Sequence, residues 1–218
     1  MELTEEILAR LRKVDPATIG HFISGGFMAP KMKPINRQSK LAGPACTVRL
    51  IGKDSTPLYY AIKHGKPGSV LVIDRCGDDT YACVGEMVAF CAEIRGFAGI
   101  VIDGPATDSL ALERSGFPVF CTGISVVTTN VFGLTGDYDK PVNCAGAVVH
   151  PGDIVLGDAD GVVVLSPEEL PAALERAEAA LAREATAKAR LTEAGYFNIN
   201  IDKLWETDVM ALINSAKE

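Results

Sequence analysis

The stretch GEMVAFCAEIRGFAGIVIDGPATD, residues 85–108, specifies more of the architecture than any other part of this chain. After Gly85 the apolar residues recur at the spacing of one helix face, and the β-branched run at 99–102 then stops at a turn beginning with Asp103. The pattern predicts a helix, a buried strand and an acidic loop, with Asp108 opening a further helix. The first N–H groups of the first helix, near Glu86 and Met87, have no partner within it and lie at the positive end of its dipole, so they predict an anion-binding position.

The rest of the chain alternates between helical and strand-like apolar patterns. In the middle of the chain strands alternate with helices, which predicts parallel strands joined by crossover helices, whereas residues 141–165 form short strands separated by turns. We therefore predict an α/β fold with a β-rich closing part, and an irregular surface loop at 123–139 of the kind that often lines a site. Helical patterns cover 4–13, 56–64, 81–95, 107–115 and 167–194, and strand patterns cover 46–51, 69–73, 99–102, 118–121, 145–149, 153–156 and 161–165.

The C-terminal part of the chain predicts a long helical extension. Ser166 is a typical N-cap, Pro167 suits the first helical position, and two acidic residues follow it. The alanine-rich helix to about residue 194 would be roughly 40 Å long, so we expect it to reach a neighbouring subunit. Gly195 ends it, and a last helix starts near Asp202. We accordingly divide the chain into a domain at 1–166 and a helical extension at 167–218.

Composition excludes several classes of protein. The 218 residues are 48% hydrophobic and 22% charged, with a formal charge of −7, which argues against nonspecific binding to nucleic acid or anionic lipid because both need clustered Lys and Arg. The chain contains no run of about 18 apolar residues, and its N-terminus, MELTEEILARLRK, is an amphipathic charged helix rather than a secretion signal. We expect a cytoplasmic protein that binds neither nucleic acid nor membrane.

Several familiar motifs are absent. The six cysteines have no CxxC spacing, which favours reduced, packed thiols over zinc binding or nucleophilic catalysis. The GDADG segment at 157–161 lacks the downstream glutamate of a calcium loop and is better interpreted as a β-turn. Neither GxGxxG nor GxxxxGK[ST] occurs, so binding of a nucleotide or of S-adenosylmethionine is disfavoured.

Carboxylates are the remaining candidates for chemistry. They follow buried strands or open helices, where α/β sheets place their ligands, and one or two of them with several waters would hold a hard divalent cation. Asp and Glu also occupy such positions for structural reasons, and the spacing leaves both interpretations open. The candidates are Asp74, Asp78, Asp79, Glu86, Asp103 and Asp108.

Five segments together resemble the RraA-like family, which includes the regulator of ribonuclease E activity A and class II pyruvate aldolases acting on 4-hydroxy-4-methyl-2-oxoglutarate. The resemblance implies a swivelling β/β/α domain assembled as a homotrimer or a hexamer of two trimers, with sites between subunits. The long C-terminal helix fits that assembly. The segments are LAGPACTVRL at 41–50, PGSVLVID at 67–74, GEMVAFCAEIRGFAGIVIDG at 85–104, FPVFCTG at 117–123 and HPGDIVLGDADGVVVL at 150–165.

The resemblance also implies roles for particular residues. The aldolase members bind Mg²⁺ or Mn²⁺ on an aspartate that corresponds to Asp108, and the arginine before it, which holds the pyruvate carboxylate, corresponds to Thr107. A threonine donates one neutral hydrogen bond where arginine offers a charged fork, so substrate binding should be weaker. The backbone amides that complete the pyruvate site correspond to Gly85, Glu86, Met87 and Val88.

Other residues would have to compensate for the missing arginine. Arg75, directly after a strand, is our first candidate for the substitute cation, and Arg114 is the second. Glu86 and Arg75 join Asp108 as catalytic candidates. The family also supplies a glutamate from the C-terminal helix region of a neighbouring subunit, and whether Glu193 or Glu184 takes that place stays open.

The sequence thus predicts a divalent-metal-dependent lyase, of the pyruvate aldolase or oxaloacetate decarboxylase type, acting on a small oxo-acid. The alternative is a noncatalytic regulator that binds a protein partner such as an RNA-degrading endonuclease. A methyltransferase acting on a quinone precursor is a third and weaker hypothesis, because the chain has no glycine-rich cofactor loop. The exact substrate, the preferred metal and the choice between trimer and hexamer stay open.

Overall fold

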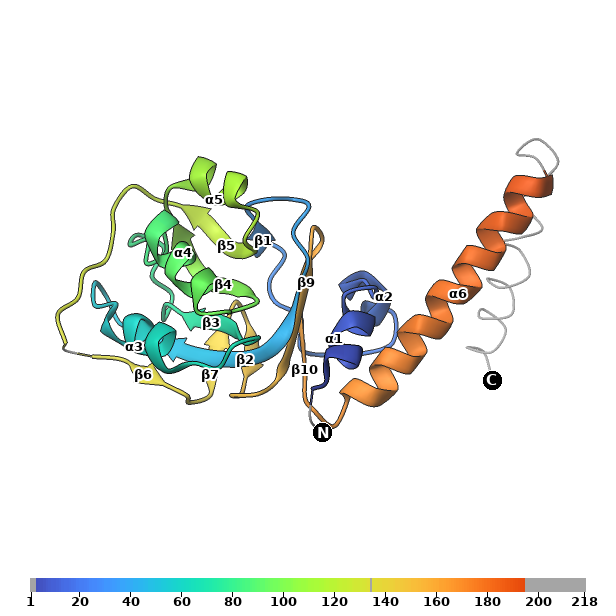
Figure 1. Ribbon diagram of the computed structural model, residues 1–218, viewed down its shortest axis with the longest axis horizontal. Coiled ribbons are helices and arrows are strands. Elements are labelled where there is room, and N and C mark those ends of the chain that lie inside the picture. The colour runs from blue at the N-terminus through green and yellow to red at the C-terminus, as the bar shows by residue number, and fades with distance from the viewer. Residues whose placement is uncertain (1–2, 134, 195–218) are drawn as a thin grey trace, which may run out of the picture. The chain divides into compact units, whose positions relative to one another are not determined.

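A computed structural model describes residues 3–133 and 135–194 of the chain (Figure 1). It divides into two compact units, Met1–Ala177 and Glu178–Glu218. The described part of the second unit is the end of helix α6 (Leu170–Ala194). The expected helix end at Gly195 and the last helix from Asp202 lie outside the described residues. Within the described residues, no helix combines the length and the apolar character needed to cross a membrane.

The first unit is built on a mixed sheet whose centre is parallel. Strands β2 (Leu41–Arg49), β3 (Val70–Asp74), β4 (Gly99–Ala106) and β5 (Val119–Ile124) run parallel in the order β5-β4-β3-β2. Antiparallel strands extend this sheet, namely β1 (Lys33–Pro34) beside β5, β9 (Ile154–Asp158) and β6 (Asp137–Tyr138) beside β2, and β10 (Gly161–Leu165) beside β9. A separate hairpin consists of β7 (Val142–Cys144) and β8 (Ala147–Val149).

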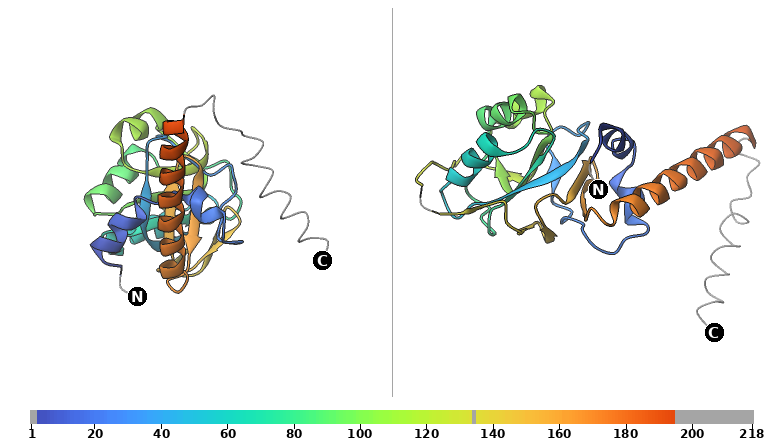
Figure 2. Two further views of the ribbon diagram at one scale, coloured as in Figure 1. Left: turned by 90° about the vertical axis from the view of Figure 1, so that its right-hand side faces the viewer. Right: turned by 60° about the horizontal axis from the view of Figure 1, so that its bottom comes forward.

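Crossover helices connect the parallel strands and gather on one face of the sheet (Figure 2). They are α3 (Thr56–His64), α4 (Glu86–Ile94) and α5 (Ser109–Ser115), and two short helices, α1 (Glu5–Leu11) and α2 (Pro16–Gly20), precede the sheet. Short connections and right-handed crossovers place such helices against the strands that they join.

The parallel strands are buried on both faces, because alternate side chains point to opposite sides of a sheet. Leu71, Ile73 and Ile102 pack into the core that contains the residues of α3 and α4. Val72 and Val101 pack instead into a second core with residues of the β7–β8 hairpin and of β9 and β10. Two cores on one sheet give three layers, with helices on one side and β structure on the other.

The elements confirm the predicted α/β alternation, with differences at their ends. The helix expected at 81–95 begins only at Glu86, because Ala82 and Val84 are buried and form parallel bridges to Thr128 and Ala106. The strand expected at 46–51 begins at 41 and ends at Arg49. The short elements α2, β1, β6 and β7 were not predicted, since two to five residues are too few to display a period.

A reciprocal cap precedes α6. The Ser166 hydroxyl accepts a hydrogen bond from the Glu169 amide at 3.3 Å, and the Glu169 carboxylate accepts from the Ser166 amide at 2.9 Å. This is a capping box, so the predicted N-cap role of Ser166 is confirmed although the helix proper starts at Leu170. Hydrogen bonds from the Ser166 amide and hydroxyl lower the pKa of Glu169.

We predict that Ser166→Ala lowers the free energy of unfolding by about 1 kcal/mol, because the Glu169 amide loses its capping acceptor. Urea denaturation followed by circular dichroism measures this difference, with Ser24→Ala at an exposed position as the control. Since the pKa of Glu169 is lowered in the folded protein, its share of the stability is present above the unfolded-state pKa and is lost as the pH falls through the folded-state value. Equal stability of the two variants at neutral pH would contradict the prediction.

Candidate active site at the carboxyl end of β4

Two turns lie side by side where β4 ends. Val84 forms a parallel bridge with Ala106, and the Thr107 amide donates to the Val84 carbonyl at 2.9 Å. The Gly85 turn, which leads into α4, therefore adjoins the 107–108 turn, which leads into α5. The carboxyl edge of a parallel sheet is the usual place for a ligand in an α/β fold.

Asp108 links the two turns. Its carboxylate oxygen Oδ2 accepts a hydrogen bond from the Glu86 amide at 3.0 Å. Its backbone is left-handed, with φ 54° and ψ 37°, a conformation that few residues other than glycine adopt and that Asp tolerates better than most. Within the described residues the contact with Glu86 is the one hydrogen bond of this exposed carboxylate, so Oδ1 is open to a ligand.

The start of α4 offers further donors. Gly85 is the N-cap, with an extended backbone at φ −130°, and the first amide bonded within the helix is that of Ala89, which donates to the Gly85 carbonyl at 3.0 Å. The Glu86 amide is engaged by Asp108, whereas the Met87 and Val88 amides belong to the first turn, which has no carbonyl partner inside a helix. Those two amides can receive an anion, and the helix dipole favours it.

Thr107 is half-buried directly before the metal candidate Asp108. The threonine hydroxyl is neutral, so this position cannot supply the two charged N–H donors that an arginine guanidinium would offer to a carboxylate. Arg114, the second candidate for a substitute cation, lies in the last turn of α5, at the opposite end of that helix from Asp108.

Arg75 is completely buried at the end of β3. Its Nη2 donates to the Gly52 carbonyl and to Oδ2 of Asp78, both at 2.8 Å. Its Nε and Nη1 are buried and have no hydrogen-bond partner among the described residues. Its aliphatic stem lies so close to Gly104 that a Cβ there would be 2.6 Å from Arg75 Cγ. These contacts hold the loop that leads toward Gly85, and they keep the guanidinium away from solvent.

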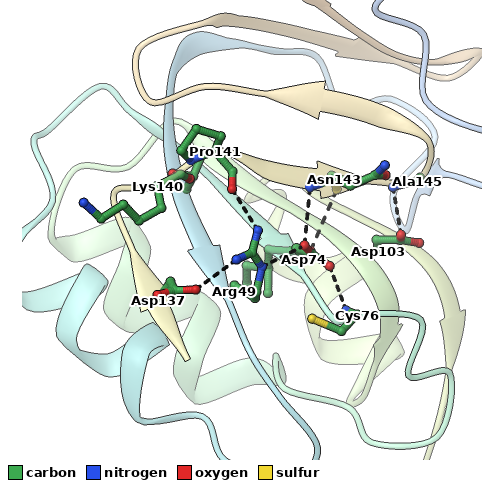
Figure 3. Close-up of polar contacts among 12 residues, drawn as sticks. Arg49, Asp74, Cys76, Asp103, Asp137, Lys140, Pro141, Asn143 and Ala145 are labelled. Carbon is green, nitrogen blue, oxygen red and sulfur yellow. Dashed lines mark hydrogen bonds and ion pairs between the residues drawn. The ribbon is translucent and has the colours of Figure 1, made fainter. Parts of the chain in front are cut away.

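The carboxylates of Asp74 and Asp103 serve the β7–β8 hairpin (Figure 3). Asp74 accepts hydrogen bonds from the amides of Asn143 and Cys76, and Asp103 accepts from the Ala145 amide at 2.8 Å. These bonds hold the hairpin on the sheet face opposite to the helices. The sequence left two interpretations open for Asp74 and Asp103, metal binding and a structural role. Their contacts favour the structural role.

Arg49 belongs to the same network, and its importance was not foreseen. Its guanidinium contacts Asp74 at 3.3 Å and Asp137 at 2.9 Å and donates to the Pro141 carbonyl at 2.8 Å (Figure 3). It thereby joins β2, β3 and β6 to the start of β7. An arginine at the end of one strand and an aspartate at the end of the next were the signal available in the sequence, since neighbouring parallel strands align such ends.

Asp78 and Asp79 lie in the loop after β3. Asp78 accepts from the Thr80 and Tyr81 amides besides its ion pair with Arg75, so its role is to shape that loop. Among the described residues, no three His, Cys, Asp or Glu side chains come together as a metal-binding group. A single carboxylate such as Asp108 with several waters is nevertheless a donor set that Mg²⁺ accepts, because Mg²⁺ keeps much of its hydration shell.

The candidates for a glutamate from the C-terminal helix lie in the second unit. Glu184 is exposed and pairs with Lys188 at 3.6 Å, one turn along the helix. The side chain of Glu193 is outside the described part of the structure. Neither residue is placed relative to Asp108, so their suggested role stays a prediction.

The cysteines are mostly buried and protonated. Burial raises the pKa of the Cys46 thiol to about 11 and that of the Cys83 thiol to about 12, and it raises the Cys144 pKa as well. All six thiols are free, and Cys76 is the exposed one. Buried thiols with raised pKa values are poor nucleophiles, which agrees with the prediction of reduced, packed thiols.

The chain is similar to known proteins in both sequence and structure. A protein from Halalkalibacterium halodurans named "Putative 4-hydroxy-4-methyl-2-oxoglutarate aldolase" is 32% identical over 174 residues, which are 79% of this chain and 82% of that protein. The crystal structure of Streptomyces coelicolor RraAS2, described as an unusual member of the RNase ES inhibitor RraA protein family, matches with a TM-score of 0.76 and 27% identity, over 86% of this chain and 98% of that one.

A third relative carries a different description. The structure of an S-adenosylmethionine: 2-dimethylmenaquinone methyltransferase from Geobacillus kaustophilus matches with a TM-score of 0.59 and 31% identity, over 64% of this chain and 85% of that one.

The structural matches confirm the mixed α/β fold with a C-terminal helix that the sequence predicted. The model of the RraA-like family, described as Aldolase/RraA, matches residues 20–164, and the chain therefore belongs to the RraA-like family.

Proposed function

We propose that this protein is a divalent-metal-dependent carbon–carbon lyase that releases pyruvate from a small oxo-acid, by cleaving a 4-hydroxy-2-oxo acid or by decarboxylating oxaloacetate. The observation that carries the proposal is the Asp108 carboxylate, which is fixed through Oδ2 on the Glu86 amide. Among the described residues, Oδ1 and the Met87 and Val88 amides have no hydrogen-bond partner. The Asp108 carboxylate can bind a cation, and the neighbouring α4 amides can bind an anion. Such a pair of groups suits a 2-oxo acid that is chelated to a metal ion and held by its carboxylate.

Asp108 would hold Mg²⁺, Mn²⁺ or another divalent ion directly or through water. When bound, such an ion supplies Lewis acidity, which stabilises the negative charge that develops on the oxygen of the 2-oxo group. The Met87 and Val88 amides bind the adjacent carboxylate, and the Thr107 hydroxyl adds one neutral hydrogen bond. Arg75 does not touch the substrate in this proposal, because it is buried and engaged by Asp78; it positions the loop before Gly85.

Cleavage then needs only the movement of one proton. The Glu86 carboxylate, exposed at the first position of α4, accepts the proton of the hydroxyl on carbon 4. The bond between carbons 3 and 4 breaks, carbon 4 becomes a carbonyl group, and the electron pair passes to carbon 3. Glu86 returns its proton to carbon 3 and pyruvate forms, so atoms and charges balance without an oxidant or a reductant.

A cytoplasmic homotrimer or hexamer is part of the same proposal. The oligomer is supported by apolar side chains after β5 that are exposed on the first unit, including Val126 at 92% and Phe132 at 52% exposure. Exposed apolar clusters of this kind commonly mark contacts between subunits. The partner on this surface is then a second copy of the chain.

Asp108→Asn should lower metal-dependent pyruvate release by about 100-fold, because the cation loses its anionic ligand. The asparagine oxygen can still accept the Glu86 N–H, so the variant keeps the fold. Coupling pyruvate to NADH oxidation by lactate dehydrogenase measures the rate with oxaloacetate and Mg²⁺. Asp139→Asn is the matched control, since Asp139 is also exposed and also left-handed, at φ 56°. Equal rates for Asp108→Asn and the native protein would refute the metal role.

Gly85→Ala tests the geometry rather than the charge. An added Cβ would lie 2.5 Å from Asp108 Oδ2 and 2.8 Å from Thr107 Cγ2, although the extended backbone itself accepts alanine. The carboxylate must move, and displacement of a reacting group by about 1 Å can cost roughly 100-fold in rate. We expect a loss of that order in the pyruvate assay. Gly25→Ala, whose Cβ meets nothing within 4 Å, should leave the rate unchanged.

A noncatalytic regulator is the second candidate, favoured by the likeness to RraAS2 and by the net charge of −7, which suits a basic partner segment. The two functions separate in one experiment, which is capture of an RNA-degrading endonuclease by the native protein and by Asp108→Asn. Capture that survives the substitution, together with no metal-dependent turnover by the native protein, would establish the regulator. Turnover that is abolished by the substitution would establish the lyase.

A further inference from the structure

A cavity of about 290 Å³ opens between α4 and α5. Its volume is close to the lower limit for small-molecule sites, about 300 Å³. Its lining includes Glu86, Met87, Phe90 and Glu93 from α4, Ala111 from α5, and Phe117.

The cavity shares two residues with the candidate active site. Glu86, whose amide holds the Asp108 carboxylate, is also part of the cavity wall, and so is Met87, whose amide is one of the two open donors. A 2-oxo acid bound at those amides would therefore have the cavity within reach of its far end. Phe90 follows one helical turn later, on the same face of α4 as Glu86 and Met87.

The lining is apolar apart from Ser115 and two negative charges. Met87 and Phe90 present large apolar side chains to the cavity and are 67% and 51% exposed. The charged residues of the lining are Glu86 and Glu93, and no Lys, Arg or His is among the described residues that line the cavity. A second carboxylate placed here would meet like charges and no counterion.

Three cations near the sheet have contacts of their own. Arg75 is buried against Asp78, and the Lys31 ammonium lies 3.8 Å from Asp103. The Lys33 ammonium donates to the Asp160 carbonyl. None of these three cations lines the cavity, so none of them is placed there to pair with a carboxylate at the far end of a ligand.

We infer that the substrate carries one carboxylate only, and that an apolar alkyl or aryl substituent on carbon 4 occupies the cavity between α4 and α5. This inference rests on the proposed lyase function and narrows its substrate class to 4-hydroxy-2-oxo monocarboxylic acids. Their cleavage yields pyruvate and an apolar aldehyde. Met87, Phe90, Ala111 and Phe117 provide the apolar surface, and Glu86 with Glu93 repels dicarboxylic competitors.

Binding of two substrate analogues that lack the hydroxyl on carbon 4 tests the inference without turnover. The ligand 2-oxo-4-phenylbutanoate has an apolar end and 2-oxoglutarate has a carboxylate there, while both present the same 2-oxo carboxylate to Asp108 and the amides. Isothermal titration calorimetry in the presence of Mg²⁺ should give a dissociation constant about tenfold lower for the phenyl acid, because like-charge contacts disfavour the other. Equal constants, or tighter binding of 2-oxoglutarate, would overturn the inference.

Two substitutions locate the preference in the cavity. Ala111→Lys places a cation in the wall and should reverse the order of the two ligands, whereas Ala172→Lys, the same change at an exposed position on α6, should not. Phe90→Ala removes an exposed wall residue with little risk to folding and should weaken binding of the phenyl acid alone. A preference unchanged in both Ala111→Lys and Phe90→Ala would place the apolar group elsewhere and overturn the inference.

The same titrations separate this inference from the proposed function. If oxaloacetate is decarboxylated in an Asp108-dependent manner but 2-oxoglutarate binds as well as the phenyl acid, the lyase function stands and the apolar substituent is refuted. If the phenyl acid binds preferentially and no oxo-acid is turned over, the cavity assignment stands and the lyase function is refuted. If neither acid binds, both are refuted.

Discussion

A hydrogen bond of 3.0 Å between the Asp108 carboxylate and the Glu86 amide joins the beginnings of two helices at the carboxyl edge of the sheet. The contact requires a glycine at 85, because a side chain there would collide with the carboxylate, and it requires the left-handed backbone of residue 108. A carboxylate in a helix N-terminal position interacts favourably with the positive end of the helix dipole. The open oxygen, the free amides and the adjoining cavity all take their positions from this bond.

The sheet keeps that edge in place by dividing its polar side chains between two faces. Asp74 at the end of β3 and Asp103 within β4 lie in register and turn toward the β7–β8 hairpin. Both accept hydrogen bonds from hairpin amides, and Asp74 also pairs with Arg49. Arg75, one residue beyond Asp74, points to the other side and is buried. The carboxylates of Asp74 and Asp103 are engaged by the hairpin, whereas Asp108 is exposed at the carboxyl edge of the sheet and is the residue to which the proposed function assigns the metal.

Thr107 and the cavity between α4 and α5 point to the same chemistry. A neutral side chain at 107 weakens the hold on a carboxylate, and apolar walls with Glu86 and Glu93 disfavour a second one. Affinity for a monocarboxylic acid would instead come from burial of its substituent, which contributes roughly 25 cal/mol per Å² of apolar surface. In the proposed lyase, apolar contact would thus take the place of charge recognition at the far end of the substrate.

The sequence was sufficient wherever a structural feature depends on residues close together in the chain. The strand at β3, the helix at α3, the capping box of Ser166 and the helix-to-strand unit at 85–108 follow from short-range period, propensity and capping. Contacts between residues far apart in the chain could not be predicted from the sequence. Asp74 meets an amide 69 positions away and Asp103 one 42 positions away, and the burial of Arg75 and the cavity beside Glu86 arise only when separate segments pack. Local patterns carry no information about which distant partner satisfies a buried charge, so the tertiary structure alone determined which carboxylates hold the hairpin on the sheet and which one stays exposed at the sheet edge.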